Sequence, residues 1–160
     1  LLGAVGAWLG GLADKAYGPK AVVTGSALIL ILCCLMVIST TDDEVLFLEL
    51  GAGSILPTVT FYIAGALIGA AGGAIQASSR TLLVDQVPRE RVTEAFGLFA
   101  LSGKATSFVG PLAIAAVTAW MSHQAFSVET AQRVGVAPIL ALFMISLLLL
   151  PFVKGKKGSA

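Results

Sequence analysis

The sequence predicts an all-α protein that crosses a lipid bilayer several times. Of its 160 residues, 57% are hydrophobic and only 12% are charged, and the mean hydropathy is +0.94. Soluble domains carry about 25% charged residues, so this chain has too few to solvate a globular surface. The stretches without Asp, Glu, Lys or Arg are 21–41, 50–79, 105–128 and 134–153. Each reaches the roughly 20 residues with which a helix spans a bilayer core.

We expect five helices, of which the first is truncated. Residues 1–12 are apolar but make only about 18 Å of helix. They also lack an initiator Met and a basic leader region, so we expect the chain to begin inside a helix. A basic loop follows at 13–20. The full spans are expected at 21–40, 56–83, 93–121 and 134–153, which makes 1–153 a partial helix bundle and 154–160 a basic tail.

Lys and Arg gather in alternate loops. Eight of the ten lie in the loop after the first helix, in or next to the loop after the third, and in the tail. The intervening loops hold only Arg133, and Lys104 falls inside a helix. Short loops rich in Lys and Arg stay on the cytoplasmic side of a membrane. We therefore expect a cytoplasmic C-terminus and, because the loops are short, a bacterial inner membrane.

The helices are of two kinds. Helices 21–40 and 134–153 are bulky, whereas the other three are rich in Gly, Ala and Ser. Small residues about four apart let helix backbones approach closely inside a bilayer. The third helix has such a face, which Gln76 and Arg80 continue. Its glycines are Gly65, Gly69, Gly72 and Gly73. This composition suits helices that slide against one another and equally a static, tightly packed bundle.

The fourth helix combines a break and a charge. Gly110-Pro111 predicts a kink, because Pro111 removes a backbone donor. Lys104 lies about 13 Å along this helix, close to the middle of the bilayer. A lysine there costs roughly 2.5–3.5 kcal/mol and normally faces a partner or a water-filled cavity. It is interpreted either as a cationic site for an anionic group, or as a lysine that snorkels or forms a structural ion pair.

The segment 10–20, GGLADKAYGPK, resembles the signature loop of the major facilitator superfamily, usually G-x-L-x-D-R-x-G-R-K. Here three residues separate Asp14 from Gly18, where the family has two, and Lys15 replaces Arg. The residues carried over from this loop are Gly11, Asp14, Lys15, Gly18 and Lys20. The resemblance implies that Asp14 and Arg80 belong to a gate at the cytoplasmic rim; the alternative for Asp14 is a solvated loop acid.

Other segments are similar to the vacuole-effluxer-like branch of that superfamily, which includes autophagy-related amino-acid effluxers and bacterial permeases. They are 73–80, 87–91 with 95–97, and 101–106 with Gly110-Pro111. The resemblance implies the C-terminal six-helix half of a major facilitator fold, from its eighth helix to its twelfth. The bulky helices would then lie outside the transport cavity, and the helices rich in small residues would line it.

The resemblance implies a secondary transporter that moves a small solute, with amino acids as candidates, by alternating access. Its partners would be the lipid bilayer, the N-terminal half of the same polypeptide and the solute. Gln76 would offer an amide to a polar substrate, or else would bond another helix. The other function class that the residues leave open is a membrane-embedded accessory or structural subunit that transports nothing.

No enzyme, cofactor, metal or nucleic-acid site is expected. His123 has no ligand partner in the sequence, and the adjacent Cys33 and Cys34 read as small apolar residues. The basic residues are dispersed among loops rather than gathered in a nucleic-acid patch. Apart from Glu94, at the very start of the span 93–121, no predicted span contains Asp or Glu, so a carboxylate that couples transport to protons is expected in the N-terminal half.

Overall fold

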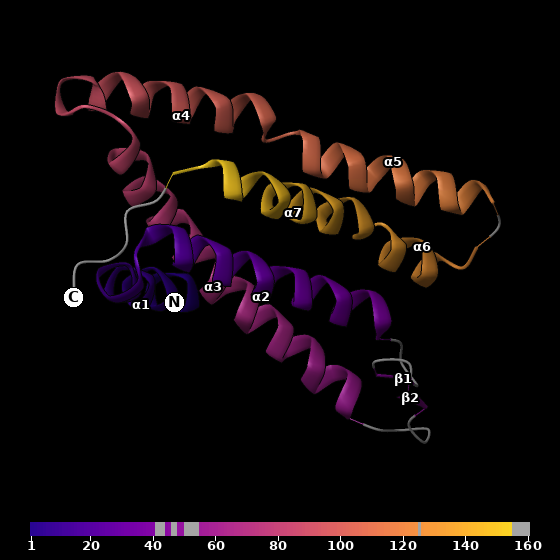
Figure 1. The fold of residues 1–160 in the computed structure, drawn as a ribbon. Coiled ribbons are helices and arrows are strands. Elements are labelled where there is room, and N and C mark those ends of the chain that lie inside the picture. Colours follow the sequence, from indigo (N-terminus) through magenta and orange to yellow (C-terminus); the bar gives the residue numbers. More distant parts are fainter. Residues whose placement is uncertain (41–43, 46–47, 50–54, 125, 155–160) are drawn as a thin grey trace.

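The computed structural model describes residues 1–40, 44–45, 48–49, 55–124 and 126–154, and it is almost entirely helical there (Figure 1). The helices are α1 (Leu2–Tyr17), α2 (Pro19–Ser39), α3 (Leu56–Gln86), α4 (Val92–Thr106), α5 (Val109–His123), α6 (Val128–Val134) and α7 (Ala137–Leu149). Single 3-10 turns cover Arg89–Arg91 and Leu150–Phe152. The strands β1 (Glu44–Val45) and β2 (Leu48–Glu49) pair antiparallel, with Glu44 opposite Glu49. Residues 155–160, most of the predicted tail, lie outside the described residues.

Within the described residues, four helical stretches are long and apolar enough to cross a membrane: Pro19–Ser39, Leu56–Gln86, Arg89–His123 and Thr130–Phe152. The predicted fold class, an all-α polytopic membrane protein, is therefore confirmed. The first helix, α1, is shorter, at 16 residues. Large apolar side chains cover the outer surface, including Trp8, Leu32 and Leu148, which are 66%, 54% and 69% exposed. Soluble monomers rarely expose so much contiguous apolar surface, whereas lipid accepts it.

The turn between α1 and α2 is tighter than the predicted loop. Residues 13–17 continue α1, so Asp14 lies inside a helix and its expected place in a loop is wrong. The reason is that the stretch Ala13 to Tyr17 contains no helix breaker. The breakers come next: Gly18 adopts φ 85, which disfavours side chains, and Pro19 opens α2.

The predicted kink in the fourth helix is an interruption of the regular helix, placed before the proline. The helix α4 ends at Thr106 and α5 begins at Val109; Ser107 and Phe108 between them keep helical dihedral angles, and Pro111 is the third residue of α5. Proline cannot donate to the carbonyl four residues earlier, and its ring clashes with that carbonyl. For Pro111 this carbonyl belongs to Ser107, so the break falls one turn before the proline. The Ser107 hydroxyl and N–H instead bond the Lys104 carbonyl, at 2.8 and 3.4 Å.

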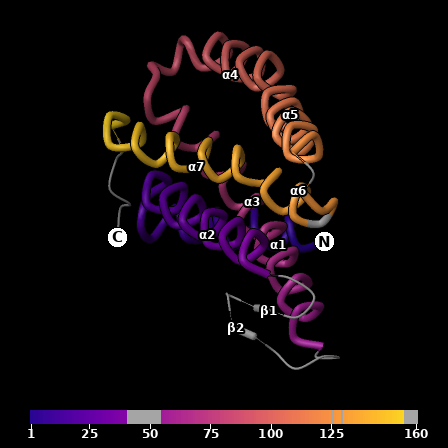
Figure 2. The backbone as a smooth tube through the Cα atoms, turned by 90° about the vertical axis from the view of Figure 1, so that its right-hand side faces the viewer, coloured from indigo at the N-terminus to yellow at the C-terminus, as the bar shows by residue number. Residues whose placement is uncertain are grey.

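The best-packed part of the protein is the group α1, α2 and α3. In both views α1 and α2 lie against α3, and α7 follows α2 (Figures 1 and 2). The most buried side chains of α2 and α3 meet here, namely Ala27, Cys33, Ala64 and Ser78. The helices α4 and α5 lie beyond α7, and every residue of α4 is at least partly exposed. The helix α4 is therefore poorly covered by the rest of the described chain.

Candidate functional site: a groove between α1 and α3

The helices α1 and α3 run parallel, with their backbones almost in contact. Gly6 lies so close to Ala70 that a Cβ on it would overlap the Ala70 backbone. A Cβ on Gly10 would lie 2.9 Å from the Cα of Ala74, which is closer than real Cβ atoms come. On the other side, Gly73 would overlap the α1 backbone in the same way. Small residues therefore allow this approach, as they do in other membrane helix pairs.

The predicted glycine face of α3 divides into two parts. Gly69 and Gly73 face α1, whereas a Cβ on Gly65 or Gly72 would meet no described atom within 4 Å. In the signature loop, a Cβ on Gly11 would also be in open space. Some of these glycines thus serve helix packing, and others leave room beside the helices.

A groove of about 490 Å³ lies along the α1–α3 contact. Its lining residues are Gly3, Ala7, Ile68, Gly69, Gly72, Gly73, Gln76, Ala77 and Arg80. Gln76 and Arg80 supply all the polar side-chain atoms of this lining. Neither side chain makes a hydrogen bond or ion pair with any residue that the structure describes. Two predicted site residues, one expected to bind substrate and one expected to gate, thus share one groove.

Asp14 is 8% exposed, and it lies four residues after Gly10, so Gly6, Gly10 and Asp14 form the buried face of α1. Gly6 and Gly10 contact α3 residues that are each 64 positions further along the chain. One further step in the same register places Asp14 level with Ser78, which is fully buried. The Asp14 Oδ1 and the Ser78 Oγ are both buried, and neither has a hydrogen-bond partner among the described residues. The register thus places a carboxylate and a hydroxyl at the same level of the α1–α3 contact.

This register places positions 14 and 78 close enough for two engineered cysteines to form a disulfide between α1 and α3. We expect an Asp14→Cys/Ser78→Cys variant to cross-link on mild oxidation, in a background where Cys33 and Cys34 are alanine. A protease site inserted between α2 and α3 cuts the chain into two fragments. Fragments that are joined by the disulfide stay together on a non-reducing gel, and this measures the cross-linking. Lys15→Cys/Ser78→Cys is the control, since Lys15 is exposed. Equal cross-linking in both pairs would contradict the register.

The remaining signature-loop residues tie this end of the bundle together. The Lys20 ammonium donates to the carbonyl oxygens of Val153, at 2.6 Å, and Pro151, at 3.3 Å. Gly18 donates its N–H to the Asp14 carbonyl at 2.9 Å, which closes the end of α1. Gln86 at the end of α3 bonds the Lys154 carbonyl. Hydrogen bonds therefore join the start of α2 and the end of α3 to residues 151–154, near the loops that carry most Lys and Arg residues.

Lys104 lies apart from the groove. It occupies the last turn of α4, just before the break, and its side chain is exposed without a described partner. Nearby, the hydroxyls of Ser102 and Thr106 donate to carbonyls of their own helix, at 2.9 and 2.8 Å. These hydroxyls are thus occupied locally, and Lys104 is the free polar group of this segment.

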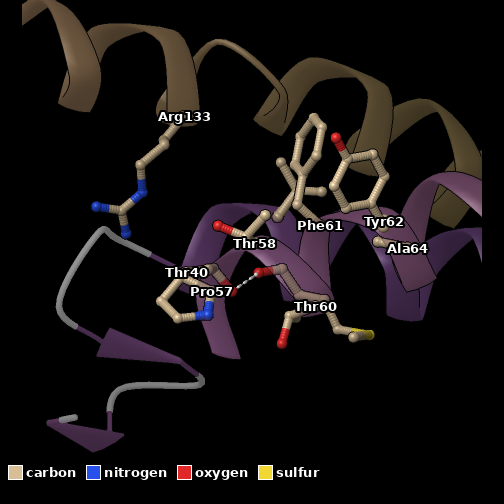
Figure 3. Close-up of a pocket in the computed structure, with 10 residues that line it drawn as sticks. Thr40, Pro57, Thr58, Thr60, Phe61, Tyr62, Ala64 and Arg133 are labelled. Carbon is tan, nitrogen blue, oxygen red and sulfur yellow. Dashed lines mark hydrogen bonds between the residues drawn. The ribbon is translucent and has the colours of Figure 1, made fainter. Parts of the chain in front are cut away.

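A second cavity, of about 350 Å³, lies between α2, α3 and α6, at the other end of α2 (Figure 3). The Arg133 guanidinium reaches from α6 and donates to the Ile38 carbonyl, at 2.6 and 3.2 Å. Phe61 and Tyr62 stand on α3 beside it, with ring centroids 6.5 Å apart. The sequence identified Arg133 only as an outer-loop charge. One general rule could have pointed to its contact with the end of α2: the last carbonyls of a helix lack donors within the helix and accept hydrogen bonds from basic side chains.

Comparisons with known proteins agree with this architecture. Residues 56–160 match the family described as vacuole effluxer Atg22 like. Over 96 residues the chain is 34% identical to the uncharacterized MFS-type transporter YxiO of Bacillus subtilis (strain 168), a match that covers 60% of this chain and 21% of the relative. The chain thus matches about a fifth of the length of that curated relative. No solved structure matches the chain. The resemblance is confirmed, and the chain is an integral, multi-pass membrane protein of the vacuole effluxer Atg22-like family of major facilitator transporters.

Proposed function

We propose that this chain forms part of a secondary transporter that moves a small solute across a membrane by alternating access. The groove beside α1 and α3 carries the proposal, because Gln76 and Arg80 are unpaired there among small residues. Charged side chains within membrane segments are costly, and they mark substrate and ion paths in many transporters. Membership of a transporter family supports a role that is not enzymatic. The volume of about 490 Å³ suits a small solute.

In this proposal Gln76 and Lys104 contact the solute, and an amino acid is the candidate. Lys104 supplies a positive charge beside a helix break, where the first N–H groups of α5 lack helical partners and add partial positive charge. The exposed surface of α4 is where the rest of the polypeptide, including its N-terminal half, would pack. Residues 1–153 form the membrane part and 154–160 a cytoplasmic tail.

The gate in this proposal is the end of the bundle at which the α1–α2 turn and the end of α3 lie, and where the start of α2 and the end of α3 are hydrogen-bonded to residues 151–154. Asp14, Lys15, Gly18, Lys20 and Arg80 lie there. Hydrogen bonds from Lys20 hold the α1–α2 turn to the end of the chain's last helix, so this end can move as one unit. The partner of Asp14 in the other conformation would come from the N-terminal half.

The full-length protein in proteoliposomes tests this function. We expect a panel of labelled amino acids and other small solutes to include at least one that accumulates faster than in empty liposomes. The solute should also exchange with an unlabelled pool, as alternating access requires. If no solute moves, while the purified protein is monodisperse and co-purifies with another transporter, the chain is an accessory subunit instead.

Topology gives a separate prediction. In cells, a Lys154→Cys variant should react with a membrane-permeant maleimide but not with an impermeant one, because the tail faces the cytoplasm. His123→Cys, at the exposed end of α5, should react with both reagents. Cys33 and Cys34 are buried and provide little background. Labelling of residue 154 by the impermeant reagent in intact cells would reverse the proposed orientation.

A further inference from the structure

Arg80 lies where it can bind a ligand as well as belong to the gate. It lines the groove between α1 and α3 together with Gln76. Every other lining residue is a glycine, an alanine or an isoleucine. The groove therefore offers one positive charge and one amide to a ligand, with otherwise apolar walls.

The two side chains are placed to act on one ligand. Gln76 and Arg80 are four residues apart on α3, so they lie one above the other on the same face. Arg80 is six residues from the end of α3 at Gln86, which is about 9 Å of helix. Gln76 is one turn deeper. A solute entering from this end would meet the guanidinium first and the amide next.

No acid of the described chain neutralises Arg80. Ion pairing among the described residues is limited to Arg91 and Glu94, on the surface. The nearest acid by register, Asp14, has its Oδ1 buried on the α1–α3 contact and forms no ion pair with Arg80. Arg80 and Gln76 are both exposed, so the guanidinium and the amide are free to contact a ligand that enters the groove.

We infer that Arg80 and Gln76 bind the carboxylate of a small solute in this groove. Arginine presents two parallel N–H donors that match the two oxygens of a carboxylate, and the Gln76 amide adds a third donor. The inference rests on the proposed function, since the bound carboxylate is that of the transported solute.

The glycine walls make the site testable without disturbing the fold. A Cβ on Gly72 meets no described atom within 4 Å, yet Gly72 lines the groove, so a larger side chain there would fill it. Gly65 is equally open but does not line the groove. Gly72→Leu and Gly65→Leu are therefore a matched pair that adds the same bulk to one helix.

The experiment measures ligand-dependent thermal stability of the full-length protein in detergent. The probes are α-amino acids and short mono- and dicarboxylates, each compared with its primary amide. We expect at least one carboxylate to stabilise the wild-type protein while its amide does not. Arg80→Gln and Gly72→Leu should weaken that binding at least about tenfold, because a hydrogen-bonded charge is lost or blocked. Arg80→Lys should retain part of it, and Gly65→Leu all of it.

Three results would overturn the inference. One is that no carboxylate stabilises the wild-type protein more than its amide. Another is an undiminished response in Arg80→Gln. The third is a response to phosphatidylglycerol but to no soluble carboxylate, which would make Arg80 a lipid contact. Transport by Arg80→Gln liposomes at the wild-type rate and affinity would leave the proposed function standing without this site. Carboxylate binding without any transport would support this site and contradict the proposed function.

Discussion

Replacing Gly73 with alanine should destabilise the protein severely, whereas the same change at the neighbouring Gly72 should not. A Cβ on Gly73 would overlap the Gly3 carbonyl oxygen and lie 2.7 Å from its carbonyl carbon. Neither backbone can yield without separating α1 from α3. Overpacking of this kind costs about 3 kcal/mol, which is a large share of the stability of most folded proteins.

The measurement is the fraction of detergent-purified protein that stays monodisperse after heating, followed over a temperature series. Gly72→Ala is the matched control, because its Cβ enters open space and alanine favours a helix over glycine. The prediction fails if Gly73→Ala and Gly72→Ala melt together. It is strengthened if Gly6→Ala, which would overlap Ala70, behaves like Gly73→Ala.

Replacing Lys104 with alanine should reduce kcat/KM for transport at least tenfold, which corresponds to about 1.4 kcal/mol. Hydrogen bonds to charged groups contribute about 1.5–3 kcal/mol. The Lys104 ammonium has no partner among the described residues, so it is free to bond the solute. Lys104→Arg keeps the positive charge and should keep most of the activity. Protein yield should be unchanged in both variants, since the side chain is exposed.

Arg91→Ala provides the control for Lys104. This variant removes a basic residue beside the same helix. The ion pair of Arg91 with Glu94, at 3.8 Å, is exposed and contributes little to stability. Uptake by this variant should match that of the wild-type protein. Wild-type rates and affinity in Lys104→Ala would instead assign Lys104 to snorkelling or to a structural pair. A parallel loss in the Lys104 and Arg91 variants would indicate a general effect of charge on this region.

The sequence was sufficient to predict the features that depend mainly on whether lipid or water surrounds a segment. Stretches such as 134–153 are too apolar for water, and helices satisfy backbone groups inside lipid, so the helical fold class followed from composition alone. Family membership followed from short motifs around Asp14, Arg89 and Lys104. Neither conclusion required knowledge of which helices touch.

The positions of the helix ends were only partly predictable. Pro111 announced a disturbance in the fourth helix, but the break falls at Ser107 and Phe108, because the carbonyl that loses its donor lies four residues earlier. Asp14 was expected in a loop because it follows the apolar stretch 1–12, in a segment that resembles a signature loop. The helix nevertheless continues to Tyr17, since its first breaker is Gly18.

By itself, then, the sequence determined that this chain is a helical membrane protein of a transporter family, because hydropathy and local motifs are properties of neighbouring residues. The tertiary structure was needed to show that Gly73 packs against α1 while Gly72 faces open space, that Asp14 is level with Ser78, and that Arg80 lines a groove with Gln76 and not with Lys104. Helix register and rotation depend on close contacts between segments more than 60 residues apart. No single helix encodes those contacts alone.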